Sequence, residues 1–425
     1  EYAGLFFYGP HQIRVMQSVF GYDPQSVAAV SADSMTGSAI VRYPGNRLVT
    51  LQFNNRCWNH NFITVLGTKS CLSLEIDLDG IFEAELDDFV RLLHERTMSE
   101  RLNDMLSPSY LLIGILASLR EGGEMPVPVD GFLLGLISDE ASQDIEEAAA
   151  LAESCGARAL EIRTVFGKQP GELNDQDIAK IRAALDTHGL LCCGISSPLF
   201  KYPLHDPLEL ERQMQALEAY IHLAEILGTR RIRGFAFWRT PGIPLGKALP
   251  TIKAALVRAA LRLREHGMIL VLENEPATYA CDGAALAQIL KEVAMPEVRA
   301  LWDPGNDGYA DTGEVAFPAG YEALKGWIDH IHIKDVARGK DGAPAGVPFG
   351  EGMIDYPGQF EQLAADGYKG WCVLETHYRA KQQLSDEALK RPGGDAFSQG
   401  GIEASRECLE NLCAFFNRNG YAVKR

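Results

Sequence analysis

The period of the hydrophobic pattern changes near residue 130. Before it, apolar and polar residues mostly alternate, as in "GSAIVRY" (37–43) and "RLVTLQF" (47–53), which a Pro-Gly-Asn turn separates. This pattern is typical of an antiparallel hairpin. We predict further strands at 62–67 and 71–76, helices at 83–96 and 107–122, and a Gly- and Pro-rich linker at 122–131.

After the linker, short apolar runs alternate with amphipathic segments that have helical periodicity. One such segment, "LELERQMQALEAYIHLAEILG", ends on a glycine, which is a helix C-cap signal. Eight alternating units predict a (β/α)8 TIM barrel, so the fold class is α/β with an N-terminal α+β domain built on a mainly antiparallel sheet. We place the domains at residues 1–126 and 127–425. The predicted barrel strands are 132–137, 159–163, 190–195, 231–237, 268–273, 299–303, 330–334 and 371–375.

Candidate chemistry lies where these strands end, because barrel active sites form at the C-terminal ends of the strands. Consecutive predicted strands deliver Glu273, Asp303, His332 and Glu375 to one rim. Taken singly, a strand-end carboxylate is more often a helix N-cap, and a lone histidine is more often a core residue. Three crowded carboxylates repel one another and need a cation, and an imidazole among them favours a divalent transition metal over calcium.

The segment 131–423 resembles the xylose-isomerase-like TIM-barrel superfamily of sugar isomerases and epimerases. The resemblance rests on "VLEN", "LWDPGN", "HIHIKD" and "FGEGMIDYPGQFEQLAADGYKGWCVLET". It implies one divalent metal ion (Mn, Mg, Co or Zn) held by Glu273, Asp303, His332 and Glu375, with His330 as a supporting residue. It also implies that Glu273 and Glu375 are catalytic and move protons on a sugar or cyclitol substrate through an enediolate.

Further residues near the predicted rim are expected to contact the substrate. Arg338 stands where related ketose epimerases place a substrate-binding arginine, whereas Asn306 replaces the histidine that those epimerases carry three positions after the metal aspartate. Lys334 either pairs with Asp335 or contacts substrate, and His377 with the following Gly-rich stretch is a candidate lid. The expected substrate-binding residues are Glu161, Arg163, Arg233, Trp238, Asn306, Lys334, Arg338, Glu351 and His377.

Residues 1–126 resemble the C-terminal, sheet-bearing half of the Gfo/Idh/MocA oxidoreductases, through "GLFFYGPHQIRVMQSVFG" and the strands that follow. His11 occupies the place of the catalytic histidine of that family, but the acidic residue usual four positions earlier is Phe7. No strand-GxGxxG-helix unit occurs in the chain, so we expect it to bind no NAD(P) alone. Two explanations stay open: a bifunctional oxidoreductase-isomerase fusion whose Rossmann domain precedes residue 1, or a sheet kept for homo-oligomerisation.

The net charge and the spacing of the cysteines narrow the classes of function that remain. A formal net charge of -17 argues against nucleic acid as the main partner, and hence against an abasic-site endonuclease. No apolar run is long enough to predict a membrane span, and nine cysteines without CxxC spacing indicate reduced thiols in a cytoplasmic protein. A non-enzymatic scaffold has no reason to crowd carboxylates. The open enzymatic alternatives are a dehydratase acting on a keto-sugar or inosose, and a sugar oxidoreductase if a Rossmann domain is present.

Overall fold

The computed structural model describes the second part of the chain almost continuously. It covers residues 129–339, 342–380, 393–419 and 421–423, and before them residues 13–14, 16–17, 24, 26–33, 36–43, 47–54, 61–66, 71–76, 108, 111–112, 114–116, 119 and 124–126. Two compact units are present. One comprises Glu1–Gly131 with Asn417–Ala422, and the other comprises Phe132–Phe416 with Val423–Arg425.

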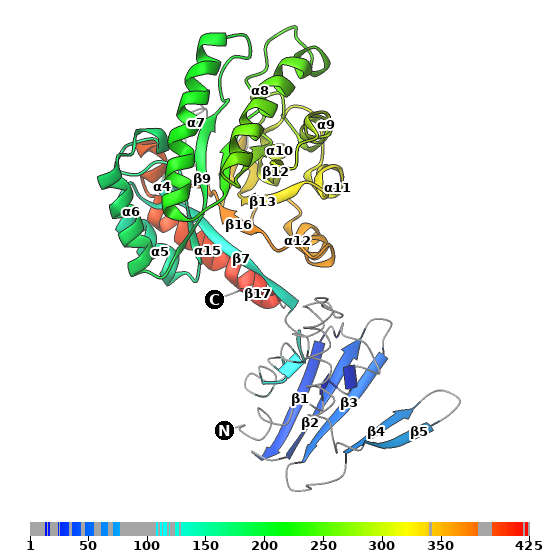
Figure 1. Ribbon diagram of the computed structural model, residues 1–425. Helices are drawn as coiled ribbons and strands as arrows, with labels where there is room; N and C mark the ends of the chain where they lie inside the picture. Colours follow the sequence, from blue (N-terminus) through cyan, green and yellow to red (C-terminus); the bar gives the residue numbers. More distant parts are fainter. Residues whose placement is uncertain are drawn as a thin grey trace. The chain divides into compact units, whose positions relative to one another are not determined.

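An antiparallel sheet with the strand order β3-β2-β1-β6 organises the described part of the first unit (Figure 1). The predicted hairpin is confirmed, because Val41 faces Val49 where β2 pairs with β3. The buried Tyr43 donates its hydroxyl hydrogen bond to Met16 Sδ at 3.2 Å, within the core beneath the sheet. The strands of this unit are β1 (Ser26–Asp33), β2 (Thr36–Tyr43), β3 (Arg47–Asn54), β6 (Glu124–Pro126) and a separate antiparallel pair, β4 (Asn61–Leu66) and β5 (Cys71–Ile76).

The stretch 122–131, predicted as a linker, ends where the two units divide, but its middle forms strand β6 and its end belongs to strand β7. β6 pairs antiparallel with β1, with Met125 opposite Val27. Pro126 lacks the N–H that an interior strand needs, and β6 tolerates it because β6 lies at the edge of the sheet. The predicted helix at 83–96, His11 and Phe7 lie outside the described residues, so the oxidoreductase resemblance stays a prediction.

Eight parallel strands close into a barrel, which confirms the predicted fold class. The strands pair in chain order, and the last closes on the first, with Trp371 opposite Leu133. Strands such as β8 and β11 are buried along their whole length, as expected of a parallel sheet covered on both faces. The barrel strands are β7 (Val129–Ile137), β8 (Ala159–Ile162), β9 (Leu191–Leu199), β10 (Arg231–Gly234), β11 (Ile269–Glu273), β12 (Val298–Trp302), β13 (Ile328–Ile333) and β16 (Trp371–Leu374).

Helices follow the barrel strands (Figure 1). In α7 the glycine signal acts as predicted, because Gly228, with a φ of 75°, ends the helix. Asp206 caps its N-terminus. The α-helices are α4 (Ser138–Ala141), α5 (Ile145–Ser154), α6 (Asp175–Thr187), α7 (Pro207–Leu227), α8 (Leu245–Glu265), α9 (Gly283–Val293), α10 (Pro304–Tyr309), α11 (Tyr321–Leu324), α12 (Tyr356–Ala365), α14 (Asp395–Ser398) and α15 (Gly401–Arg418). The shorter elements are η2 (Pro170–Glu172), η3 (Ala316–Gly320), β14 (Asp335–Arg338), β15 (Pro344–Val347) and β17 (Tyr421–Val423).

One barrel strand is shorter than its apolar run predicts. β10 ends at Gly234, whereas the apolar run continues to Phe237. Phe237 has a φ of 57°, which is incompatible with an extended strand, and it stacks on Phe200 at a ring-centroid distance of 5.2 Å. The run therefore turns into a packed loop at the rim of the barrel. None of the helices in the described part of the chain combines the length and the hydropathy needed to cross a lipid bilayer.

Candidate metal centre

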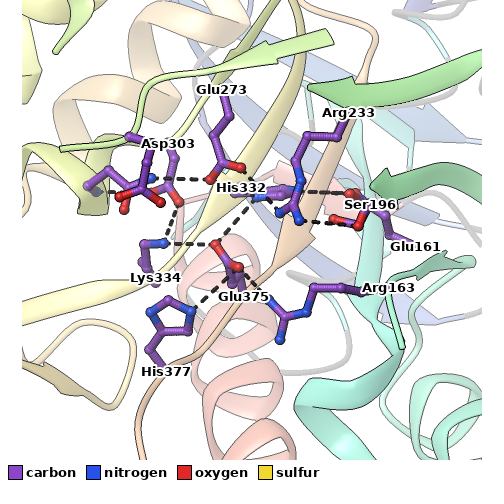
Figure 2. A network of polar contacts seen from close by, with 12 residues as sticks. Glu161, Arg163, Ser196, Arg233, Glu273, Asp303, His332, Lys334, Glu375 and His377 are labelled. Atoms are coloured by element: carbon purple, nitrogen blue, oxygen red, sulfur yellow. Dashed lines mark hydrogen bonds and ion pairs between the residues drawn. The ribbon is translucent and has the colours of Figure 1, made fainter. Parts of the chain in front are cut away.

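Four buried ligand-type side chains from four consecutive barrel strands meet at one rim. Glu273 is the last residue of β11, Asp303 directly follows β12, His332 lies on β13 and Glu375 directly follows β16. One potential ligand atom from each lies within 4.8 Å of the others. Figure 2 shows the four side chains turned toward one another. We call these four residues the quartet.

Asp303 combines the ordinary role of a strand-end aspartate with a place in the quartet. Its Oδ1 accepts a hydrogen bond of 3.2 Å from the backbone N–H of Asn306 and so caps α10. Its Oδ2 lies 2.7 Å from Lys334 Nζ. Gly305 permits this approach, because a Cβ at that position would overlap the Lys334 side chain. Burial, opposed by Lys334 and reinforced by Glu375, raises the pKa of Asp303 to about 7.

His332 is oriented by Glu161 of β8. The Glu161 carboxylate lies 3.2 Å from His332 Nε2 and 2.6 Å from His330 Nε2. His332 Nδ1 is thereby left facing Glu273 Oε1 at 3.6 Å and Glu375 Oε2 at 3.5 Å. Burial alone would lower the pKa of His332, but Glu161 and the two quartet glutamates hold that pKa well above its usual value. The expected supporting role of His330 agrees with this contact, whereas Glu161, expected to bind substrate, contacts both histidines.

Basic side chains face each of the two quartet glutamates. Glu273 Oε2 lies 3.2 Å from Arg233 Nη1, and Glu273 Oε1 accepts a hydrogen bond of 3.2 Å from Asn306 Nδ2. Glu375 is held at both oxygens, by Arg163 Nη1 at 2.6 Å and by Lys334 Nζ at 2.8 Å. Lys334 therefore pairs with Asp303 and Glu375, and not with Asp335, whose carboxylate accepts backbone N–H groups of the loop 350–354 instead.

These basic groups determine the charge of the glutamates. Burial would raise the pKa of Glu273, but Arg233 and His332 outweigh it and lower the pKa. Burial would likewise raise the pKa of Glu375, but Lys334 and His377 hold it well below its usual value. Both glutamates are therefore carboxylates at neutral pH, able to bind a cation or to accept a proton.

The quartet fits a divalent cation. Although two of these atoms lie at ion-pair distance from Arg233 or Lys334, no described residue makes a hydrogen bond with Glu273 Oε2, Asp303 Oδ2 or His332 Nδ1, and all three atoms are buried. Glu273 Oε2 and Asp303 Oδ2 thus have only an ion-pair partner, and His332 Nδ1 faces two carboxylates beyond hydrogen-bond distance, so a cation bound among them would give these buried atoms a closer partner. Three carboxylates and one imidazole suit manganese, magnesium, cobalt or zinc.

Two other groups in the described residues bring ligand-type side chains equally close, but their atoms are already engaged. In the group of Glu161, His330 and His332, the glutamate holds both rings. In the group of Glu140, Glu375 and His377, Glu140 pairs with Arg163 at 2.7 Å and Arg379 at 3.1 Å. Each of these two groups brings three ligand-type side chains together, whereas the quartet brings four. The quartet is therefore the better site for an ion.

The remaining predicted substrate residues divide into two sets. His377, with a φ of 47°, lies beside the quartet, its Nε2 3.5 Å from Glu375 Oε1. Arg338 and Glu351 are exposed, and the Arg338 guanidinium donates to the carbonyl of Gly342 at 3.4 Å. Trp238 is 43% exposed at the start of the loop that follows β10, so its ring remains available to a ligand.

Sequence reasoning missed three buried polar residues next to the quartet. Asp139 and Glu140 lie on the short helix α4, which directly follows β7, and both are fully buried around Arg163. Asn274 donates to the Asp303 carbonyl at 2.8 Å and accepts from the Asp303 N–H at 2.8 Å, which fixes the end of β12. The signal was available, because "SDE" ends the first barrel strand as "EN" ends the fifth, and the strand-end rule applies to both.

Known proteins resemble the barrel part of the chain. An inosose dehydratase from Serratia proteamaculans is 34% identical over 111 residues, which is 23% of this chain and 35% of that protein. The chain thus spans about a third of the length of this relative. The rhizopine catabolism protein MocC from Rhizobium meliloti is 25% identical over 244 residues, covering 51% of this chain and 72% of MocC.

Solved structures share the fold at lower identity. A D-allulose 3-epimerase from Methylomonas sp. superposes with a TM-score of 0.53 at 16% identity, covering 67% of this chain and 98% of that one. An L-ribulose 3-epimerase gives a TM-score of 0.53 at 17% identity, covering 68% and 95%. The family model of the xylose isomerase-like TIM barrel matches residues 149–411, which is more than half of the chain. The chain therefore belongs to the xylose isomerase-like TIM barrel family.

Proposed function

We propose that this protein is a divalent-metal-dependent isomerase or epimerase of a sugar or cyclitol. The observation that carries the proposal is the quartet: four buried ligand-type side chains within 4.8 Å, three of them with a buried atom that makes no hydrogen bond to a described residue. Glu273, Asp303, His332 and Glu375 would hold the ion. When bound, the ion would polarise a substrate carbonyl and its neighbouring hydroxyl and so acidify the adjacent C–H bond.

The side chains of the chain itself supply the proton transfer. Glu273 and Glu375 end strands β11 and β16, and both are carboxylates, as a proton acceptor must be. One carboxylate takes the proton from the carbon next to the carbonyl, and an enediolate forms on the substrate. Return of the proton to the opposite face gives an epimer, and return to the neighbouring carbon gives the isomeric aldose or ketose.

Glu273 is the better proton acceptor of the two. Its contacts are one guanidinium at 3.2 Å and one amide, whereas Glu375 has a guanidinium and an ammonium at 2.6 and 2.8 Å. A carboxylate with two cations on it is a weak base. Lys334, in contact with Glu375 and Asp303, keeps a pKa well above its usual value and so stays charged, which leaves Glu375 as the group that would return the proton.

A dehydratase is the second candidate, favoured by the similarity to inosose dehydratases. Its first step is the same removal of a proton next to a carbonyl. The enediolate then expels hydroxide from the following carbon, a proton donor converts the hydroxide to water, and the substrate becomes an unsaturated ketone. His377 would supply that proton, since its Nε2 lies 3.5 Å from Glu375 Oε1.

Solvent deuterium exchange tests the proposal. Metal-free protein, with and without added Mn²⁺, is incubated in deuterium oxide with free keto-sugars, inosose-type ketones and 3-keto-glycosides, and the products are followed by NMR. We expect deuterium next to the carbonyl of at least one class, only with metal, and not with the Glu273→Gln variant. An epimer or isomer supports the first candidate, and an unsaturated ketone the second. Exchange that is equally fast without metal or with Glu273→Gln would overturn both.

A further inference from the structure

A buried cluster of charged residues lies beside the quartet, at the ends of β7 and β8. Its members are Asp139, Glu140 and Arg163, whose side chains are at most 2% exposed. The sequence suggests a substrate contact for Arg163. The contacts of its guanidinium indicate a different role.

Each nitrogen of the Arg163 guanidinium already donates a hydrogen bond to a carboxylate. Nε donates to Asp139 Oδ1 at 2.6 Å, Nη2 donates to Glu140 Oε1 at 2.7 Å, and Nη1 donates to Glu375 Oε1 at 2.6 Å. The Phe397 ring covers one face, with its centroid 4.5 Å from the guanidinium carbon. Three of its five N–H groups are therefore committed to buried carboxylates, and any movement of Arg163 toward a substrate would break a buried ion pair.

The two carboxylates that hold Arg163 are themselves fixed. Asp139 Oδ2 accepts hydrogen bonds from Thr164 Oγ1 at 2.5 Å and from the backbone N–H of Gly394 at 2.9 Å. Glu140 Oε2 accepts from Arg379 Nη2 at 3.1 Å and from the His377 N–H at 3.3 Å. Both carboxylates are thus tied to backbone as well as to side chains, and Arg163 has one arrangement available.

This arrangement gives the two oxygens of the Glu375 carboxylate different partners. Oε1 is tied to Arg163, so Oε2 is the oxygen that faces Lys334 at 2.8 Å and His332 Nδ1 at 3.5 Å (Figure 2). Each oxygen of the Glu375 carboxylate therefore has its own cation, and two charge-assisted contacts from different directions fix its orientation. Without Arg163, Glu375 Oε1 loses its 2.6 Å partner, Lys334 alone holds the carboxylate at hydrogen-bond distance, and Glu140 loses one of its cations.

We propose that Arg163, fixed by Asp139 and Glu140, is a positioning residue that presents Glu375 Oε2 to the quartet and does not bind substrate. This proposal rests on the proposed metal-dependent function. Groups that orient metal ligands typically contribute about 10- to 100-fold to metal affinity. Loss of the Arg163 guanidinium is therefore expected to weaken metal binding itself, before any substrate is added.

Titration of the metal-free full chain with Mn²⁺, with and without guanidinium ion, tests this. We expect Arg163→Ala to raise the Mn²⁺ dissociation constant by about 10- to 100-fold, and guanidinium ion to restore part of the loss by filling the vacated site. Arg163→Lys keeps a charge but cannot contact three carboxylates, so we expect weaker Mn²⁺ binding that guanidinium ion does not restore. Arg258→Ala removes a surface guanidinium paired with Glu211 and is the matched control.

The possible outcomes separate this proposal from the function on which it rests. Wild-type Mn²⁺ affinity in both Arg163 variants would overturn the positioning role and return Arg163 to the substrate. Weakened binding in Arg163→Ala without rescue by guanidinium ion would also overturn it, because general loss of structure explains that result. Absence of an Mn²⁺ site in the wild-type chain would overturn the proposed function itself.

Discussion

At the residue level, the two quartet glutamates differ in how many arginine and lysine side chains they pair with. Both face His332, but Glu375 also pairs with Arg163 and Lys334, whereas Glu273 pairs with Arg233. Replacing either by glutamine should reduce proton exchange by about 100- to 10,000-fold, because an amide cannot accept the proton. Glu375→Gln should also lower the free energy of unfolding by about 3–5 kcal/mol, since it leaves buried cations uncompensated. Chemical denaturation of both variants measures the difference. Equal stability of the two would show that the contacts of Glu375 contribute little.

The same residues show what a sequence can predict of a site. The quartet was predictable because each member lies at a strand end, and chain topology alone brings strand ends together. The partner of Lys334 could not be predicted from the sequence. Asp335 is the neighbour of Lys334 in sequence, but its carboxylate points toward the loop 350–354. The choice between substrate contact and side-chain pairing for Glu161 and Arg163 also depends on directions across several strands, which periodicity does not give.

At the level of elements, α10 and the start of α9 are joined by a buried acidic pair. Asp307 of α10 lies next to Glu314, whose oxygens accept the N–H groups of Gly283 and Ala284 at the N-terminus of α9. Asp307 Oδ1 also accepts from Asn274 Nδ2 at 3.1 Å, and Asn274 fixes the backbone of Asp303. Burial, reinforced by Glu314 and Asp282, raises the pKa of Asp307 to about 9. The pair therefore holds a proton at neutral pH and connects α9 to the quartet.

This proton makes stability depend on pH. The folded state binds it up to a pKa of about 9, whereas the unfolded chain releases it near 3.8, so Asp307 makes the folded state less stable as pH rises through that window. Asp307→Asn keeps an acceptor and a donor but has no proton to lose. As the pH rises from 5 to 8, the unfolding free energy of Asp307→Asn relative to that of the wild type should therefore increase by up to about 1.4 kcal/mol per pH unit.

Denaturant unfolding across this pH range measures the effect of Asp307→Asn. The same substitution at Asp311, which is exposed and paired with Arg239, is the control and should leave the pH dependence unchanged. If Asp307→Asn and the wild type lose stability in parallel as pH rises, Asp307 is not the proton-binding group.

At the scale of the whole molecule, the fold was more predictable than the boundary between its parts. Eight strand runs at regular spacing specify a barrel, because their period and their order both follow from local sequence. The sequence predicted a linker at 122–131 because Gly and Pro are common in loops. In the structure, the middle of this stretch is strand β6, which pairs with β1 at the edge of the sheet. Edge pairing is a non-local interaction that composition does not report. The front unit as half of an oxidoreductase, or as an oligomerisation surface, stays a prediction.

The charge of the whole chain agrees with the proposed centre. A net charge of -17 attracts divalent cations and disfavours a phosphate backbone. Within that field the quartet is the place where three carboxylates and an imidazole converge without enough hydrogen bonds to satisfy them. The central claim is therefore that the quartet holds one ion.

Measuring the stoichiometry of Mn²⁺ binding to the metal-free chain tests this claim most directly. Calorimetry, or the electron paramagnetic resonance signal of free Mn²⁺, counts the ions bound by the wild type, by His332→Ala and by His188→Ala. The last variant removes a surface histidine that also lies between two glutamates, Glu146 and Glu153, and it is the matched control. We predict one ion per chain in the wild type and the control, and none at the same concentration in His332→Ala. No bound ion in the wild type, or one ion retained by His332→Ala, would contradict the account.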